Sequence, residues 1–181
     1  MTDEKILGFL SEASQQERGF RLLVDTYGDR LYQHIRRMLG SHEDADDVLQ
    51  NTLVKVYRNV SKFKGNSQLY TWLYRIATNE TLTYLDRKKR RNKLFLHSGA
   101  DVELKMSQQK AENEVDGEFI KYRLQQAMDE LPPKQKMVFS LRYFEEKTYQ
   151  EMSDLTGTSV GALKASYHHA VRKIETFLSN T

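Results

Sequence analysis

The stretch from Phe63 to Arg91 combines the residue types that bind separated DNA strands. It starts with the polar loop 64–68 and ends on the basic run 87–91, and between them lie the aromatic residues Tyr70, Trp72, Tyr74 and Tyr84. Aromatic rings stack on exposed bases, and fixed positive charge binds phosphates. The stretch is therefore a candidate surface for unpaired DNA. The alternative is an amphipathic helix with a core-facing aromatic stripe and a solvated basic end, which is favoured on these residues alone.

The composition indicates an all-α protein. Of 181 residues, 39% are hydrophobic and 29% are charged, and only 2 prolines and 9 glycines are present, which favours helices over a turn-rich β fold. No apolar run approaches the roughly 18 to 20 residues that span a bilayer, and the first residues do not resemble a signal peptide. There is no cysteine for a disulfide or a thiolate metal site. We expect a cytoplasmic protein with no membrane insertion.

The net charge of +3 is too small to indicate nucleic-acid binding by itself, but the charges are unevenly distributed. Acidic residues cluster at 42–47 and between 101 and 118, whereas basic residues cluster at 87–93 and recur on the last predicted helix. Separate acidic and basic surfaces suggest contacts with at least two kinds of partner.

The first half of the chain predicts a series of helices. Apolar residues recur every three or four positions over 4–39, which we expect to form a helix in two pieces. Gly40 and Ser41 then break the pattern, and Ser41 is a candidate N-cap with Asp44 in a capping-box-like position. A second helix is predicted over about 43–60. Its polar face carries acids and amides at Asp44, Asp47, Gln50 and Asn51.

Two explanations of that polar face remain open. Acids in the first turn oppose the positive end of the helix dipole, which explains the charges without a partner. This explanation accounts less well for Gln50 and Asn51, two amides in the middle of a helix. A partner-binding face is the rival hypothesis.

A loop at 61–68 leads into a long predicted helix over about 69–91. The spacing of Trp72 with Leu69, Leu73 and Ile76 favours a core position for the indole rather than contact with DNA. Asn79 differs from these apolar residues. A polar residue in the middle of a helix is mildly unfavourable unless it is exposed or makes a functional contact.

The periodicity fades after the basic run, so we predict domains at 1–91 and 118–181 joined by a flexible linker at 92–117. The second domain begins with a helix that stops at Pro132. A helix follows that starts near Pro133, carries Phe144 and ends around 145–147. Thr148 then caps a short helix with Glu151 three residues on, and a turn at 156–158 leads to a longer helix capped by Ser159. Two helices joined through a Gly-containing turn predict a helix-turn-helix.

The last helix has an outward face suited to the major groove. An inward stripe includes Leu163, Ala170, Ile174 and Leu178, which leaves the polar residues Lys164, Ser166, His168, His169 and Arg172 for outward or flanking positions. Lysine and arginine bind phosphates, and Lys164 can also reach guanine acceptors. The alternative is a solvated polar face on a C-terminal helix; the capped helix-turn-helix spacing favours DNA contact.

No catalytic or metal-binding constellation emerges. His42 lies near Asp44 and Asp46, but no second histidine follows four residues on. His168 and His169 are adjacent, so their side chains diverge by about 100° on a helix and do not easily share one ion. The sequence also has neither a Gly-rich phosphate loop nor a nucleophile elbow. We expect neither an enzyme nor a metal or other cofactor.

Taken together, these motifs resemble a sigma-70 family RNA polymerase sigma factor of the compact extracytoplasmic-function (ECF) type. The segment 44–60 is similar to the region that docks on the beta-prime clamp helices, 63–91 to the segment that melts and reads the −10 promoter element, and 131–175 to the module that reads the −35 element. Three motifs in this order, with a linker between the second and third, cover nearly the whole chain.

The resemblance implies roles for individual residues. Asp44, Asp47, Gln50 and Asn51 fall in the polymerase-docking motif. The −10 contacts fall on Phe63, Lys64, Gly65, Asn66 and Ser67, on Asn79, and on Arg87 and Arg90 of the basic run. The −35 contacts fall on Lys164, Ser166, His168, His169 and Arg172. Ser166 and His169 replace arginines of the commonest family pattern, which removes two guanine-binding forks and puts the preferred −35 sequence in doubt.

The resemblance also implies partners: core RNA polymerase through its beta-prime clamp helices and beta flap, promoter DNA, and an anti-sigma protein that covers these surfaces. A stand-alone helix-turn-helix regulator is the main alternative, and it would bind specific duplex DNA without core polymerase. A helical adaptor that binds only protein is a third possibility, in which Lys164, His168 and Arg172 have no role.

Overall fold

The computed structural model of the protein describes residues 3–97, the first half, and residues 117–180, the second half. Within these two ranges all regular structure is helical, which confirms the all-α prediction. The elements of the first half are α1 (Asp3–Ser11), α2 (Gln16–Leu39), α3 (His42–Asn59), the short 3-10 turn η1 (Val60–Lys62) and α4 (Leu69–His97). Those of the second half are α5 (Gly117–Asp129), α6 (Pro133–Tyr143), α7 (Tyr149–Thr156) and α8 (Val160–Ser179).

The core of the first half forms where the apolar stripes of α2, α3 and α4 meet. The buried side chains that line it include Leu23, Leu31, Ile35, Met38, Val48, Val56, Leu69, Leu73 and Ala77. Helix α1 packs closely on α2 at Gly19. A Cβ atom at this position would lie 2.8 Å from the backbone nitrogen of Leu10, so a larger residue would push α1 away from α2. Tyr57 of α3 lies at the edge of this core: the residue is 43% exposed, and its ring meets that of Phe20 edge-on at 5.1 Å.

Local signals set the helix boundaries between α2 and α3. Gly40 ends α2 in the left-handed conformation at φ 76°, which glycine adopts without steric penalty. Ser41 caps α3 as predicted, and its Oγ accepts a hydrogen bond from the Asp44 backbone nitrogen at 3.3 Å. The Asp44 side chain does not complete a capping box with Ser41. It instead hydrogen-bonds Tyr84 and Lys88 of α4.

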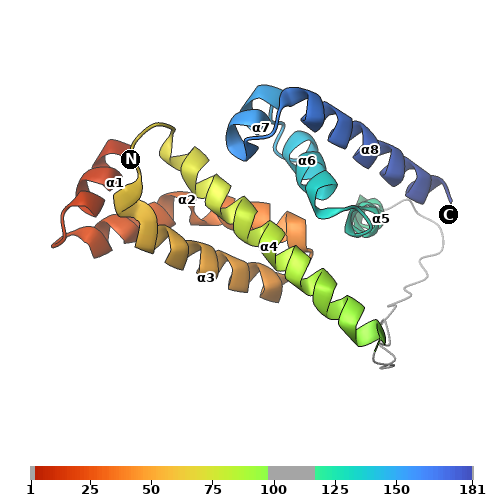
Figure 1. The fold of residues 1–181 in the computed structure, drawn as a ribbon, viewed down its shortest axis with the longest axis horizontal. Coiled ribbons are helices and arrows are strands. Elements are labelled where there is room, and N and C mark those ends of the chain that lie inside the picture. The colour runs from red at the N-terminus through yellow and green to blue at the C-terminus, as the bar shows by residue number, and fades with distance from the viewer. Residues whose placement is uncertain (1–2, 98–116, 181) are drawn as a thin grey trace.

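α4 is longer than the sequence predicted. The periodic pattern fades after Arg91, but the helix continues to His97, because no Gly or Pro interrupts the chain before Gly99. The first six residues of the predicted linker are therefore helical, and the remainder up to residue 116 lies outside the described residues. Figure 1 shows the end of α4 extending beyond α3.

In the second half, α6 begins at Pro133, as predicted, where the missing backbone N–H has no helical partner to lose. α6 ends at Tyr143 with Phe144 as its C-cap, short of the predicted end around 145–147. The chain turns sharply after it, with Glu146 at φ 53° and the Lys147 backbone nitrogen donating to the Leu141 carbonyl at 3.0 Å.

α7 and α8 form the predicted helix-turn-helix. Thr148 and Glu151 make a reciprocal capping box, and the hydrogen bonds from the Thr148 backbone and hydroxyl lower the pKa of the Glu151 carboxyl. Gly157 ends α7 at φ 69°, and Ser159 caps α8. The inward stripe of α8 holds for Leu163, Ala170 and Ile174, but Leu178, next to the end of α8, is 42% exposed.

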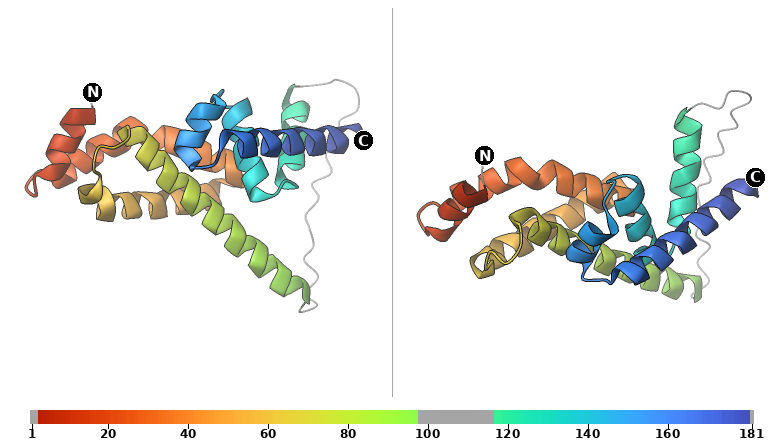
Figure 2. Two further views of the ribbon diagram at one scale, coloured as in Figure 1. Left: turned by 45° about the horizontal axis from the view of Figure 1, so that its top comes forward. Right: turned by 90° about the horizontal axis from the view of Figure 1, so that it is seen from above.

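The two halves pack against each other. α6 and α7 lie on α2 and α4 (Figure 2). Apolar side chains from both halves join one continuous core. The contribution of the second half to it is Met137, Val138, Leu141, Met152, Leu155 and Leu163. A smaller separate core joins α5, α6 and α8.

We expect Thr148→Ala to destabilise the protein by about 1 kcal/mol, because it removes the side-chain cap of α7. Thr148→Ser keeps the hydroxyl and should retain most of the stability. Urea denaturation followed by circular dichroism measures both. Equal midpoints for the alanine variant and the wild type would contradict the importance of this cap.

Candidate nucleic-acid interface

The predicted strand-binding loop lies between η1 and α4, and one aromatic contact holds its start. The rings of Phe63 and Trp72 lie 5.4 Å apart, and both are half-buried against the core. Lys64, Gly65 and Asn66 are exposed, and Gly65 adopts φ 71° in open space. The loop therefore presents polar groups to solvent on an apolar support.

The aromatic run of α4 is largely structural. Tyr74 is fully buried and Tyr70 and Trp72 are half-buried, which agrees with the core-facing aromatic stripe and with the core position predicted for Trp72. Burial and the nearby Glu145 carboxylate raise the pKa of Tyr74. Asn79 lies on the same helix but is exposed, so its amide is accessible in the middle of α4.

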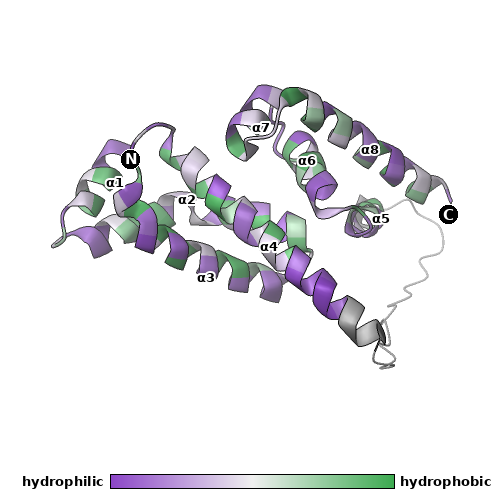
Figure 3. Cartoon of the chain, viewed as in Figure 1, coloured by the Kyte–Doolittle hydropathy of each residue, from purple (hydrophilic) through white to green (hydrophobic). Residues whose placement is uncertain are grey.

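The basic end of α4 is polar and projects away from the body of the molecule, as Figure 3 shows. Arg87 and Arg90 are exposed there. Lys88 is half-buried and ion-paired with Asp44, at 2.5 Å between Nζ and Oδ2. Neighbouring cations of this segment therefore differ in their surroundings, since Lys88 links α4 to α3.

Asp44 is held inside the first half. Its carboxylate accepts hydrogen bonds from the Tyr84 hydroxyl at 2.6 Å and from Lys88, and its side chain is only 19% exposed. Partial burial opposes ionisation, but these hydrogen bonds outweigh it and lower the pKa of Asp44. The same contact acts in the opposite direction on the phenol: burial and the Asp44 carboxylate raise the pKa of Tyr84 to about 12.

The other predicted docking residues, Asp47, Gln50 and Asn51, are exposed on α3. Gln50 also lines a shallow, mainly apolar hollow of about 490 Å³ between α2 and α3, next to Leu53 and Tyr57. The four residues grouped by the sequence are therefore divided: three face solvent and Asp44 faces α4.

The recognition helix α8 presents its polar side chains as predicted. Lys164, His168, His169 and Arg172 are exposed, whereas Ser166 is half-buried. The Lys164 ammonium lies 5.7 Å from the centre of the Tyr149 ring of α7, which links the two helices beside the exposed face. The exposed cations can contact phosphates and base edges without rearrangement of the helix.

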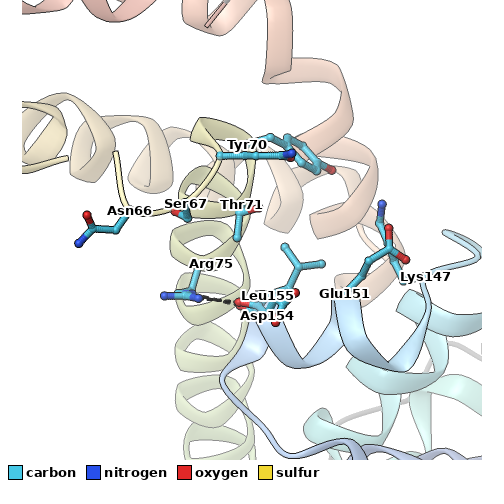
Figure 4. A pocket seen from close by; sticks show the side chains of 10 residues that line it. Asn66, Ser67, Tyr70, Thr71, Arg75, Lys147, Glu151, Asp154 and Leu155 are labelled. Carbon is cyan, nitrogen blue, oxygen red and sulfur yellow. Dashed lines mark hydrogen bonds between the residues drawn. The ribbon is translucent and has the colours of Figure 1, made fainter. Parts of the chain in front are cut away.

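A cleft of about 550 Å³ separates the loop and α4 from α7 (Figure 4). Asn66 and Ser67 line it from one side, and Glu151 and Asp154 from the other. Arg75 crosses it and donates to the backbone carbonyls of Asp154 at 2.5 Å and Leu155 at 3.3 Å. The predicted −10 loop and the helix-turn-helix thus face each other across one cleft.

The sequence interpretation missed a polar cluster between the two halves. The Glu145 carboxylate, from the loop between α6 and α7, accepts hydrogen bonds from Tyr74 and from His34 of α2. The available signal was His34 itself, a polar residue that lies between Leu31 and Met38 of the apolar stripe of α2.

Two further findings concern the described residues alone. In residues 3–97 and 117–180, no group of three or more His, Asp or Glu side chains is arranged to hold a metal ion. None of the helices in those ranges is both long and apolar enough to cross a membrane.

The fold and the site define a helical DNA-binding protein, with an exposed polar loop in its first half and a recognition helix in its second. Sequence comparison agrees with this class. The family Sigma-70 region 2 matches residues 23–91, and the family Sigma-70, region 4 matches residues 121–174.

Among known proteins, the ECF RNA polymerase sigma factor SigW of Bacillus subtilis is 32% identical over 163 residues, which cover 85% of this chain and 87% of SigW. The ECF RNA polymerase sigma-E factor of Haemophilus influenzae is 29% identical over 181 residues, covering 97% of this chain and 94% of that protein. The chain therefore belongs to the ECF group of sigma-70 family RNA polymerase sigma factors. It is a promoter-specificity subunit, and a stand-alone regulator does not explain matches to both sigma regions in one chain.

Solved structures agree with the fold. CnrH in complex with the cytosolic domain of CnrY superposes with a TM-score of 0.66 at 22% identity, over 98% of this chain and 97% of that one. The sigma factor RpoE in complex with the anti-sigma factor NepR from Bartonella quintana gives a TM-score of 0.64 at 21% identity, over 88% of this chain and 96% of that one.

We expect Asp44→Asn to lower the pKa of the Tyr84 phenol from about 12 towards the ordinary value of about 10. The carboxylate disfavours the phenolate by its charge and by accepting the phenol's hydrogen bond, and the amide has no negative charge. A pH titration of tyrosine ring carbons by NMR, with Tyr84→Phe to assign the signal, measures the change. Asp46→Asn, a change at an exposed neighbour, should leave the titration as it is.

Proposed function

We propose that the two halves of this sigma factor divide polymerase docking, −10 capture and −35 reading among three separate surfaces. The proposed division has region 2 at 1–91, a linker at 92–117 and region 4 at 118–181. The observation that carries it is the pattern of exposure: polar residues of three motifs are exposed at separate places, while the residues between them form the core.

The docking surface is the exposed face of α3, with Asp47, Gln50 and Asn51 against the beta-prime clamp helices. The apolar hollow beside Gln50 supports it, because protein interfaces combine an apolar centre with a polar rim. Asp44 has a different role in this proposal. It orients the basic end of α4 through Tyr84 and Lys88 and so acts on DNA binding indirectly.

The −10 element is captured as a separated strand. Lys64, Gly65, Asn66 and Ser67 hold a flipped base, and Phe63 supports the loop by packing on Trp72. Asn79 contacts the unpaired strand beside that base, and Arg87 and Arg90 bind phosphates. Capture of this kind converts transient opening of the duplex into binding energy.

The −35 element is read by α8. Lys164, His168 and His169 meet base edges, Arg172 meets phosphates, and Ser166 lies at the margin of the contact. The second half also contacts the beta flap, so the polymerase sets the distance between the two DNA-binding surfaces. Histidine and serine in place of arginines predict a modest affinity for the −35 element by itself.

The chain supplies no catalytic group of its own, because the polymerase carries out the chemistry, and it acts in the cytoplasm where the polymerase works. Relatives of the same fold have been solved with anti-sigma partners, as in the RpoE–NepR complex, which supports regulation of this chain by an anti-sigma protein.

We expect Asn79→Ala to slow promoter opening about tenfold and to leave core polymerase binding unchanged, because it removes a hydrogen bond made only to the opened strand. Fluorescence of 2-aminopurine within the −10 element reports opening. Thr83→Ala, at an exposed position one turn further along α4, should open the promoter at the wild-type rate.

Gln50→Ala should give the reverse pattern, with core binding weakened about tenfold and normal opening once the polymerase is saturated. Titration of labelled sigma factor with core polymerase measures the affinity. If Gln50→Ala and Asn79→Ala have the same defect, the separation of docking and strand capture is wrong.

Lys164→Ala should reduce the preference of the holoenzyme for its −35 sequence about tenfold, as expected for one base-reading contact. Lys173→Ala is the matched control, since nine residues place it on the opposite side of α8. Competition between promoters with intact and scrambled −35 elements measures the preference. An equal loss in both variants would indicate a general effect of charge rather than base reading.

A further inference from the structure

A notch in the first half holds one carboxylate of the second half. His34 and Arg37 of α2 and Tyr74 of α4 form the notch, and the Glu145 side chain enters it. Oxygen Oε1 of Glu145 lies 2.7 Å from the Tyr74 hydroxyl, 3.0 Å from His34 Nδ1 and 3.8 Å from Arg37 Nη1. Because a carboxylate only accepts hydrogen bonds, both the phenol and the imidazole donate to it.

Two members of the notch, His34 and Tyr74, are buried, whereas the Arg37 side chain at its edge is 35% exposed. The His34 side chain is 0% exposed and the Glu145 side chain 11% exposed. His34 is itself fixed, since its Nε2 lies 3.1 Å from the Thr78 hydroxyl. Burial opposes ionisation of Glu145, but the contacts with His34, Tyr74 and Arg37 outweigh it and lower the pKa of the carboxyl. His34 Nδ1 also contacts the Tyr74 hydroxyl, so the imidazole and the phenol form one buried cluster around the carboxylate. Contact with three donors at once fixes the position of the Glu145 carboxylate.

Further contacts bring the same two surfaces together. Arg37 also lies over the ring of Phe144, 5.7 Å from its centre, next to Glu145 in the chain. On the other side of the interface, Arg75 donates to the last carbonyls of α7, and Leu155 is buried in the shared core. The interface therefore combines an apolar centre with two polar anchors.

The packing of the second half on the first, called the closed arrangement below, places the two proposed DNA-binding surfaces close together. Glu151 of α7 lines the same cleft as Asn66, and from there the chain to Arg172 comprises part of α7, a short turn and 13 residues of α8. At about 1.5 Å per helical residue and at most about 3.6 Å per extended residue, the path from Glu151 to Arg172 is no longer than about 40 Å, to which the width of the cleft is added. The −10 and −35 promoter elements lie about 25 base pairs apart, which corresponds to about 85 Å on B-DNA. The closed molecule cannot occupy both.

We propose that the notch of His34, Arg37 and Tyr74 is a carboxylate-binding site that keeps the free sigma factor closed by holding Glu145. Polymerase assembly must vacate this site before the two halves can reach both promoter elements. The second statement rests on the proposed function, whereas the closed state of the free chain does not.

The closed state can be tested on the full-length chain, which contains no cysteine to interfere with labelling. Cysteines introduced at two exposed positions, Ser61 beside the loop and Gln150 on α7, carry a donor and an acceptor dye. Single-molecule energy transfer then measures the fractions of closed and open molecules. We expect Glu145→Ala to raise the ratio of open to closed molecules about tenfold, and Glu145→Gln to raise it less, because the amide still accepts hydrogen bonds.

Glu146→Gln is the matched control, since it makes the same change one residue further on at an exposed position of the same loop. Arg37→Gln changes the notch from the other side and should also favour opening, which covers the case in which Glu145→Ala fails to fold. Circular dichroism checks the helical content of each variant. If the Glu145 and Arg37 variants keep the wild-type ratio, the notch does not hold the molecule closed and the proposal is overturned.

A second measurement adds core polymerase to the labelled wild-type chain. Release of the notch predicts that the closed population disappears, and that Glu145→Gln binds core polymerase several-fold more tightly because less closed molecule has to open. A holoenzyme that retains the closed signal would overturn the role in assembly. If the chain fails to bind core polymerase at all, the proposed function fails while the closed state of the free chain stands.

Discussion

The structure depends on α4 packing against two different surfaces at once. Leu69, Leu73 and Ala77 bury one side of the helix in the core of the first half. Tyr74 and Arg75, one and two residues after Leu73, point instead towards α6 and α7 and hydrogen-bond to the second half. Since adjacent residues of a helix diverge by about 100°, a single helix can serve both surfaces. Displacing α4 would therefore disturb the core, the loop before it and the contact between the halves together.

Much of the fold could be predicted from local sequence. The caps at Ser41, Thr148 and Ser159 depend on residues three positions apart, and Pro133 sets its own backbone angle, so short windows contain the necessary information. The apolar stripes were also readable, because the helical period brings their members to one face. The errors lie at the ends of stripes, as at Leu178, where burial depends on whether another helix reaches that far.

The contact between the halves could not be predicted in the same way. Glu145 and His34 are 111 residues apart, and no periodic pattern connects a loop carboxylate with an imidazole on a distant helix. Tyr74 illustrates the same limit, since its residue type fits base stacking and its burial follows from a neighbour far along the chain. Within one motif, Asp44 and Asp47 differ for a comparable reason: both belong to α3, but only Asp44 has Tyr84 and Lys88 of α4 opposite it.

The capping of the helix-turn-helix has a consequence for the order of folding. Thr148, Gly157 and Ser159 satisfy the ends of α7 and α8 with groups at most four residues away, and contacts between near neighbours form early because little chain entropy is lost in closing them. The contacts of Glu145 with Tyr74 and His34 span 71 and 111 residues and need both halves in place first. The difference in sequence separation therefore favours formation of the helix-turn-helix before the halves close, and an open form of the molecule before the closed one.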